Sequence, residues 1–109
     1  MYMPREHRFH LGSLTFVWDS GKNRANAAKH GVAFEEAATT WLDSMAIERF
    51  DDEHSQDEDR RFHIGLSLRG ALLVSWWTIR LEHGDEIIRI IGSRRANRSE
   101  WRLYEEKNR

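Results

Sequence analysis

Apolar residues recur along this chain with two periods, and each period predicts one kind of element. In LTFVWD, at 14–19, Leu14, Phe16 and Trp18 alternate with other residues, as in a strand with one buried face. Alternation, or a continuous apolar run, predicts four further strands at 45–50, 62–68, 71–79 and 87–94. Between two of them, the dipeptide RG at 69–70 offers a two-residue hairpin turn.

Two adjoining helices are predicted after the first strand. A helix over 20–30 is expected because Asp19 or Ser20 can cap its first turn and Gly31 can end it in a left-handed conformation. A helix over 34–42 is expected because its apolar residues fall on one helical stripe. That stripe consists of Phe34, Ala37, Ala38, Trp41 and Leu42.

A third helix is predicted at the C-terminal end. Asn97 stands three residues before Glu100, a variant of the capping box, and the helix places Trp101 and Tyr104 on one side. The order β-α-α-β-β-β-β-α predicts an α+β fold, with a mostly antiparallel β-sheet, two N-terminal helices and one C-terminal helix. We expect residues 1–12 to be a flexible N-terminal extension and residues 13–109 to form a single domain.

Composition indicates a cellular compartment and shows that charge is unevenly distributed along the chain. The chain has no cysteine, which excludes disulfides and thiolate metal sites and favours a reducing, cytoplasmic compartment. No apolar stretch approaches the length of a membrane span, so no membrane partner is expected. The net charge is −1, yet residues 43–59 carry eight acids against one base and residues 89–102 carry five arginines against one acid. We therefore expect an acidic end and a basic end.

Several kinds of active site are excluded by missing residues. A metal site can be imagined from His54, Asp57, Asp59 and His63, but their spacing matches no ligand pattern, so no metal is expected. The chain has no glycine-rich phosphate loop, no G-x-S-x-G elbow and no cysteine nucleophile. The usual nucleotide-hydrolase and acyl-transfer sites are therefore absent, and no organic cofactor is expected.

Basic residues remain as candidates for chemistry. Four arginines gather where the last strand meets the last helix, and their forks could converge on a phosphodiester or simply be solvated at a helix end. They are Arg94, Arg95, Arg98 and Arg102. Trp76 and Trp77 could stack on bases of single-stranded RNA, although adjacent strand residues point to opposite faces and at least one of the two is expected in the core.

The first predicted helix carries a second basic group. Lys22, Asn26 and Lys29 share one polar face, which is ordinary for a surface helix. His30 could carry a proton in catalysis, but a histidine next to Gly31 can equally interact with the last helix carbonyls. We interpret His30 mainly as a helix-end residue.

Three ordered blocks resemble the BrnT family of bacterial type II toxins. They are FVWDSGKNRANAAKHGVAFEEA, EDRRFHIGLSLRGALLVSWW and IIRIIGSRRANRSEWRLYEE. The resemblance runs from about Phe16 to Glu106. It implies a RelE-like fold, a ribonuclease activity that arrests translation, and a cognate BrnA-like antitoxin with a DNA-binding region of the ribbon-helix-helix kind.

The family's motifs can be carried over residue by residue. WDxxKNxxNxxKHG falls on Trp18, Asp19, Lys22, Asn23, Asn26, Lys29, His30 and Gly31; ERxxxxG falls on Arg60 and Gly65; ISARRA falls on Ile91 to Ala96. At Ala33 the family usually has Ser, so the second helix loses a side-chain cap worth about 1 kcal/mol. Gly92 and Ser93 replace Ser and Ala, which loosens the strand before Arg94 and predicts a weaker activity.

The resemblance therefore implies a metal-independent endoribonuclease with an RNA substrate. RNA cleavage requires a deprotonated 2′-hydroxyl, neutralised phosphorane charge and a protonated leaving oxygen. Our candidate catalytic residues are Lys29, His30, Arg60 and Arg94, with Lys22, Arg95 and Arg98 as further RNA phosphate ligands.

Strand alternation makes two predictions about faces. It places Arg60 with Phe62 and Ile64, on an apolar face. It places Arg94 on one face with Ile88, Ile90 and Gly92.

Two alternatives remain open. One is a non-catalytic module that binds nucleic acid or an antitoxin, because the sequence contains no unambiguous acid–base pair. The other is an interaction protein whose acidic segment 51–59 binds a basic partner.

Overall fold

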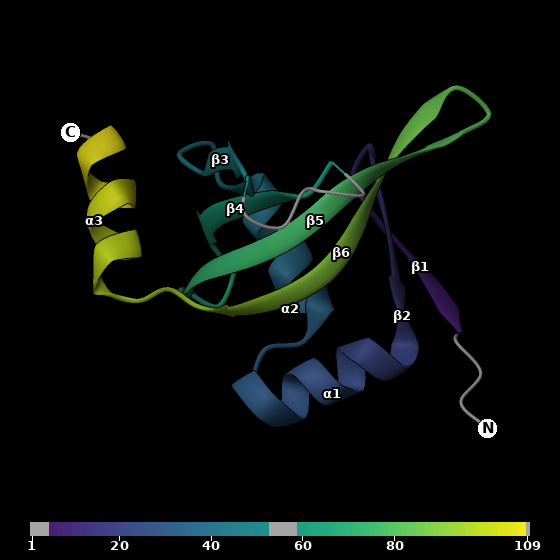
Figure 1. The fold of residues 1–109 in the computed structure, drawn as a ribbon, viewed down its shortest axis with the longest axis horizontal. Coiled ribbons are helices and arrows are strands. Elements are labelled where there is room, and N and C mark those ends of the chain that lie inside the picture. The colour runs from purple at the N-terminus through teal and green to yellow at the C-terminus, as the bar shows by residue number, and fades with distance from the viewer. Residues whose placement is uncertain (1–4, 53–58, 109) are drawn as a thin grey trace.

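The computed structural model describes residues 5–52 and 59–108. Its elements are β1 (Glu6–Leu11), β2 (Leu14–Asp19), α1 (Ser20–His30), α2 (Phe34–Thr39), the 3-10 helix η1 (Thr40–Leu42), β3 (Ile47–Phe50), β4 (Arg61–Leu66), β5 (Leu72–Glu82), β6 (Asp85–Arg95) and α3 (Arg98–Lys107). The strands form one six-stranded sheet in the order β1-β2-β6-β5-β4-β3 (Figure 1).

The sheet is mixed rather than simply antiparallel. β2 pairs with β6 in parallel, with Phe16 opposite Ile88, whereas the other four pairings are antiparallel. The parallel pair arises because α1 and α2 carry the chain to the far edge, from which β3, β4, β5 and β6 return as successive hairpins. The α+β class is confirmed, and the mostly antiparallel description is corrected to a mixed sheet.

The expected flexible extension is wrong for residues 6–11, because they form β1. This strand pairs with β2 from Glu6 opposite Asp19 to Leu11 opposite Leu14. Gly12, at φ 60°, supplies the left-handed residue of the connecting turn. The alternation of Phe9 and Leu11 was a usable signal for this strand. Residues 1–4 lie outside the described residues.

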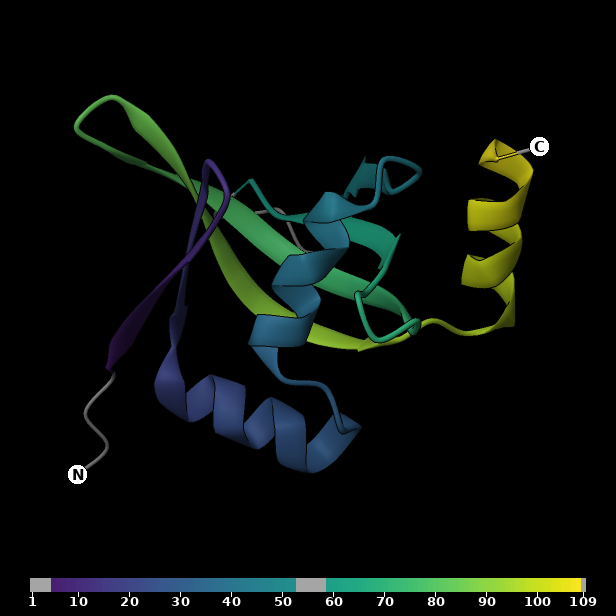
Figure 2. The same cartoon turned by 180° about the vertical axis from the view of Figure 1, so that it is seen from behind.

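The sheet has two differently covered faces. We call the face against α1 and α2 the inner face; its core includes Phe16, Trp18, Leu73 and Ile90. We call the opposite face the outer face; Tyr104 of α3 packs there among Ile47, Ile64, Leu72 and Val74. Figure 1 shows α2 behind β5 and β6, and Figure 2 shows it in front of them. The helices therefore do not form one layer, because α3 lies on the other face from α1 and α2.

Most predicted elements are confirmed, with changed boundaries. The second helix ends at Thr39 and continues as η1, which leaves Leu42 exposed. The turn predicted at 69–70 is a longer loop, in which Ser67 N donates to Ala71 O. None of the described helices is long and apolar enough to cross a membrane.

Trp76 and Trp77 point to opposite faces, as predicted. Trp77 is buried against Trp41 on the inner face, with ring centroids 5.6 Å apart. Trp76 packs at the edge of the outer-face cluster.

Candidate functional site

Helix α1 presents the first group of candidate residues. Asp19 caps it by accepting a hydrogen bond from Lys22 N at 2.9 Å, and it ends at His30, followed by Gly31 at φ 71°. These boundaries match the prediction. The side chains of Lys22, Lys29 and His30 are exposed, and within the described part of the chain they make no hydrogen bond or ion pair.

Asn26 does not belong to the polar surface of α1. Its Nδ2 donates to Val32 O at 2.9 Å and to Ser93 O at 2.8 Å, and its Oδ1 accepts from Ser93 N at 3.2 Å. Three hydrogen bonds thus fix the C-terminal half of α1 to β6 and to the loop before α2. The interpretation of Lys22, Asn26 and Lys29 as one solvated face is wrong for Asn26.

Asn23 compensates for the departure at Ala33. Ala33 is the N-cap of α2 and offers no side-chain hydrogen bond. Asn23 Oδ1 accepts from Phe34 N at 2.7 Å instead, and Asn23 Nδ2 donates to Glu35 at 2.8 Å. The start of α2 is therefore capped from the neighbouring helix, and the expected loss of about 1 kcal/mol is offset. The two asparagines of the KNxxN segment are structural.

A β-bulge changes the face on which Arg94 lies. Trp76 pairs with Gly92 and Trp77 pairs with Ile90, so Ile91 is an extra residue in β6. Ile90 and Ser93 therefore both lie on the inner face, whereas Arg94 pairs with Val74 of the outer face. The prediction that Arg94 shares a face with Ile88 and Ile90 is wrong, because an inserted residue reverses strand alternation.

Arg94 is held on three sides. Its guanidinium carbon lies 5.1 Å from the centroid of the Trp76 ring, and Nη1 donates to Arg95 O at 3.1 Å. Nη1 and Nη2 donate to the two oxygens of Glu100 at 2.8 and 2.9 Å. Glu100 Oε1 also accepts from Asn97 N at 2.8 Å, within the predicted capping box.

The ion pair between Arg94 and Glu100 shifts the pKa values of both side chains. Burial by itself would raise the pKa of Glu100, but hydrogen bonds from Arg94 and Asn97 lower it on balance. Hydrogen bonding to Glu100 raises the pKa of Arg94. Both groups are therefore charged at neutral pH, and the anion at this basic end belongs to the protein itself.

Of the remaining predicted arginines, Arg95 and Arg98 lie near this corner, whereas Arg60 lies away from it, four residues before Ile64 in the row of Arg94. Arg95 is exposed and pairs with Leu73, which places it on the inner face. Arg98 is exposed in the first turn of α3, beside a cavity of about 480 Å³ that Trp101, Arg102 and Glu105 also line. Arg60 is half-buried next to β4, and its carbonyl accepts from Asp51 N. Because α1 packs against the inner face and Arg94 lies on the outer face, the sheet separates Lys29 and His30 from Arg94.

Arg89 was not among the predicted site residues, although it lies at the middle of the outer face. It is half-buried and pairs with Thr78 on one side and with Val17 on the other. With Glu6 and Asp19 it lines a cavity of about 180 Å³. The segment IIRIIG contains an indication of this position, because an arginine inside an apolar central strand is rarely buried without a partner or a functional role.

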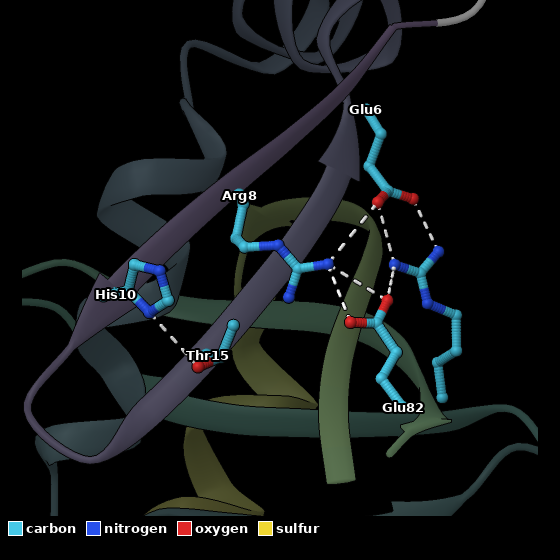
Figure 3. A network of polar contacts seen from close by, with 6 residues as sticks. Glu6, Arg8, His10, Thr15 and Glu82 are labelled. Carbon is cyan, nitrogen blue, oxygen red and sulfur yellow. Dashed lines mark hydrogen bonds and ion pairs between the residues drawn. The ribbon is translucent and has the colours of Figure 1, made fainter. Parts of the chain in front are cut away.

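Next to the cavity lined by Arg89, a network of charged side chains joins segments that are distant in the sequence. Arg80 of the β5–β6 hairpin donates to Glu6 of β1 and to Glu82, and Arg8 donates to Glu82 at 2.8 Å (Figure 3). Hydrogen bonding to Arg80 lowers the pKa of Glu6, and hydrogen bonding to Arg8 lowers that of Glu82. The network ties β1 to the hairpin and compensates the two arginines.

His63 is a buried structural residue. Its ring stacks on Trp41 with centroids 3.9 Å apart and an interplanar angle of 2°. Nε2 lies 3.2 Å from Thr40 O and Nδ1 lies 3.4 Å from Glu48 Oε1, so both nitrogens face acceptors. Hydrogen bonding with His63 lowers the pKa of Glu48.

The imagined metal site lies partly outside the described residues, because His54 and Asp57 belong to 53–58. Within 5–52 and 59–108, no three His, Asp or Glu side chains are grouped so that they could hold a metal ion.

Comparison with known families identifies most of this chain. A family model described as "Ribonuclease toxin, BrnT, of type II toxin-antitoxin system" matches residues 18–100. This range includes α1, the β4–β5 and β5–β6 hairpins and the Arg94–Glu100 pair. A search of curated proteins found no match.

Proposed function

Because the chain belongs to the BrnT family of ribonuclease toxins of type II toxin–antitoxin systems, we propose that it is a metal-independent endoribonuclease that inhibits translation and that a cognate antitoxin neutralises. Its relation to RelE-like ribonucleases is part of the same proposal. So are a cytoplasmic location and a BrnA-like antitoxin with a DNA-binding region, which would cover the basic surface until it is released.

The outer face is the RNA-binding surface in this proposal. The observation that carries it is the position of Arg89 and Arg94 on the central strand β6, with Trp76 beside Arg94. Guanidinium groups bind phosphate through paired hydrogen bonds, and an aromatic ring next to them favours single-stranded RNA. Among the described helices only α3 packs on this face, at one end.

Charge neutralisation of the phosphorane is assigned to Arg94 and Arg60, with Arg95, Arg98 and Lys22 as further phosphate ligands. Lys29 or His30 would carry the protons, from the other side of the sheet. Asn26 supports this arrangement, since it binds Ser93 and so brings the end of α1 next to the strand that carries Arg94. An RNA strand that passes around this end of β6 would meet both groups.

RNA cleavage is the direct test. Purified protein is incubated with total RNA, with and without a chelator, and the products are separated by size. We expect cleavage that the chelator does not prevent. Cleavage abolished by the chelator would contradict metal independence, and intact RNA in both samples would favour the non-catalytic binding module.

Growth supplies an independent test in cells. Induced expression of the chain alone should stop growth and protein synthesis, and co-expression of the antitoxin should abolish the effect. A culture that grows and synthesises protein normally after induction would contradict the toxin function for this chain.

A further inference from the structure

The Arg94 guanidinium already binds an anion, and that anion is the Glu100 carboxylate. We infer that the Arg94 fork is a phosphodiester subsite whose present occupant, Glu100, competes with RNA for it. This inference rests on the proposed function, because the competing ligand is the RNA substrate. The proposed function names residues that bind the substrate; the inference adds Glu100 as a residue that weakens this binding.

The geometry of the pair matches the geometry of phosphate binding. Nη1 and Nη2 each contact a different oxygen of Glu100, at 2.8 and 2.9 Å. A phosphodiester also presents two unbridged oxygens, and the planar guanidinium binds carboxylate and phosphate in the same paired manner. Glu100 is also the one acid among the five arginines of 89–102, which agrees with an anion placed there to neutralise them.

After exchange of the two anions, each partner of the pair keeps one other contact. When Arg94 turns to a phosphate, Glu100 keeps its hydrogen bond from Asn97 N, and Arg94 keeps its position over Trp76. The Arg94 side chain is 33% exposed, so an incoming phosphate can reach it. A fully buried pair would resist such exchange, because the abandoned charge would stay desolvated.

Helix α3 has anchors that do not involve this pair. Tyr104 is 8% exposed, and its hydroxyl donates to Asp43 Oδ2 at 2.7 Å. Lys107 and Asn108 donate to the carbonyls of Ala46 and Met45. The two hydrogen bonds of the capping box, between Asn97 and Glu100, do not involve Arg94. Loss of the Arg94–Glu100 pair would therefore leave α3 in place.

The experiment measures binding apart from cleavage. A fluorescein-labelled, single-stranded 2′-O-methyl oligoribonucleotide has phosphodiesters but no 2′-hydroxyl to attack, so its anisotropy reports affinity alone. Glu100→Gln keeps an oxygen to accept from Asn97 N and removes the competing charge. We expect it to bind on the order of tenfold more tightly than the parent.

Two controls separate competition from a general change in charge. Glu105→Gln removes an exposed acid from the same helix, and its affinity should stay close to that of the parent. Arg94→Ala combined with Glu100→Gln should lose the gain, because the subsite itself is removed. A gain of equal size in Glu105→Gln, or one that persists without Arg94, would overturn the inference.

A purely structural pair predicts the opposite result. In that case Glu100→Gln still folds but binds no better than the parent, which also overturns the inference. If Glu100→Gln fails to fold, Glu100→Asp replaces it, since the shorter carboxylate competes less well for the fork. The parent's cleavage of total RNA is measured alongside, so that a failed inference with active parent enzyme is distinguished from a failed proposed function.

Discussion

The two basic groups of this protein differ in what holds them before any ligand arrives. At the end of α1, Lys29 and His30 extend into solvent. At the junction of β6 and α3, Arg94 is fixed between Trp76 and Glu100. The first group keeps its charge available but must lose side-chain freedom on binding, whereas the second is already ordered and must give up a carboxylate.

This difference assigns different roles to the two groups. A fixed guanidinium is suited to stabilise charge in a transition state, because little reorganisation is needed at the moment of reaction. An exposed lysine or histidine can exchange a proton with the RNA without first giving up a protein partner. We therefore expect substitution of Arg94 to reduce the rate most and substitution of His30, which we interpret as a helix-end residue, to reduce it least.

The largest effect is predicted for Arg94→Ala. It should lower RNA cleavage on the order of a hundredfold, since one charge partner of the transition state is lost. It should also cost about 1 kcal/mol of unfolding free energy, because Glu100 loses its partner while it keeps Asn97 N. Arg94→Lys should recover part of the rate, because an ammonium keeps the charge without the fork.

Cleavage rates and thermal unfolding of both Arg94 variants check this prediction. Full activity in Arg94→Ala would remove Arg94 from the site. Lost activity together with a collapsed melting temperature would make it a structural residue, and the proposed difference between the two groups would disappear.

A second prediction sharpens the comparison within α1. Asn26→Ala removes three hydrogen bonds to Val32 and Ser93, so we expect a loss of about 2 kcal/mol in unfolding free energy. Lys29→Ala, one helical turn away, should stay within about 0.5 kcal/mol of the parent. Urea unfolding of both variants measures the difference, and equal stabilities would contradict the anchoring role of Asn26.

Local patterns were sufficient to predict most of the fold. The alternation in LTFVWD, the apolar stripe at 34–42 and the capping box at Asn97 each act over a few residues, and each element is present. The parallel contact of β2 with β6 depends on how distant segments assemble, which no local period specifies. Strand β1 was missed because its charged residues obscured the alternation of Phe9 and Leu11.

The candidate site was less predictable, for two physical reasons. The bulge at Ile91 reverses the alternation of β6, so the face of Arg94 could not be counted from Ile88. The pairing of Arg94 with Glu100 depends on the angle at which α3 leaves the strand, which the sequence does not specify. The apolar neighbours of Arg89 predict only a core strand and do not indicate which face the arginine occupies.

A third prediction concerns acid and isolates the Arg94–Glu100 pair. Contacts with Arg94 and Asn97 lower the pKa of Glu100 below its ordinary 4.5, so the folded carboxyl resists protonation more than the unfolded one. Its contribution to stability is therefore complete above about pH 4.5 and is lost as the pH falls through the lower, folded-state pKa.

Glu100→Gln lacks this contribution at every pH. At pH 7 the free energy of unfolding of the parent should exceed that of Glu100→Gln by on the order of 1 kcal/mol. This difference should disappear as the pH falls below 4.5. Urea unfolding at a series of pH values measures the gap, with Glu105→Gln as the matched variant. A gap that stays constant with pH would show that Glu100 acts through packing rather than through its charge.

The smallest effect is predicted for His30→Gln. His30 is the last residue of α1, and its exposed side chain makes no hydrogen bond within the described residues, so its removal should change the melting temperature little. The end of the helix is fixed by Gly31, whose N donates to Ala27 O at 2.9 Å, and this contact does not involve the imidazole. We expect the cleavage rate of His30→Gln to be retained and the acidic limb of its pH–rate profile to be unchanged, with Lys29→Gln measured beside it as the neighbouring proton carrier. Loss of the acidic limb in His30→Gln, with an unchanged melting temperature, would instead make the exposed histidine the proton carrier, and the basic group of α1 would then take part in the chemistry as directly as Arg94.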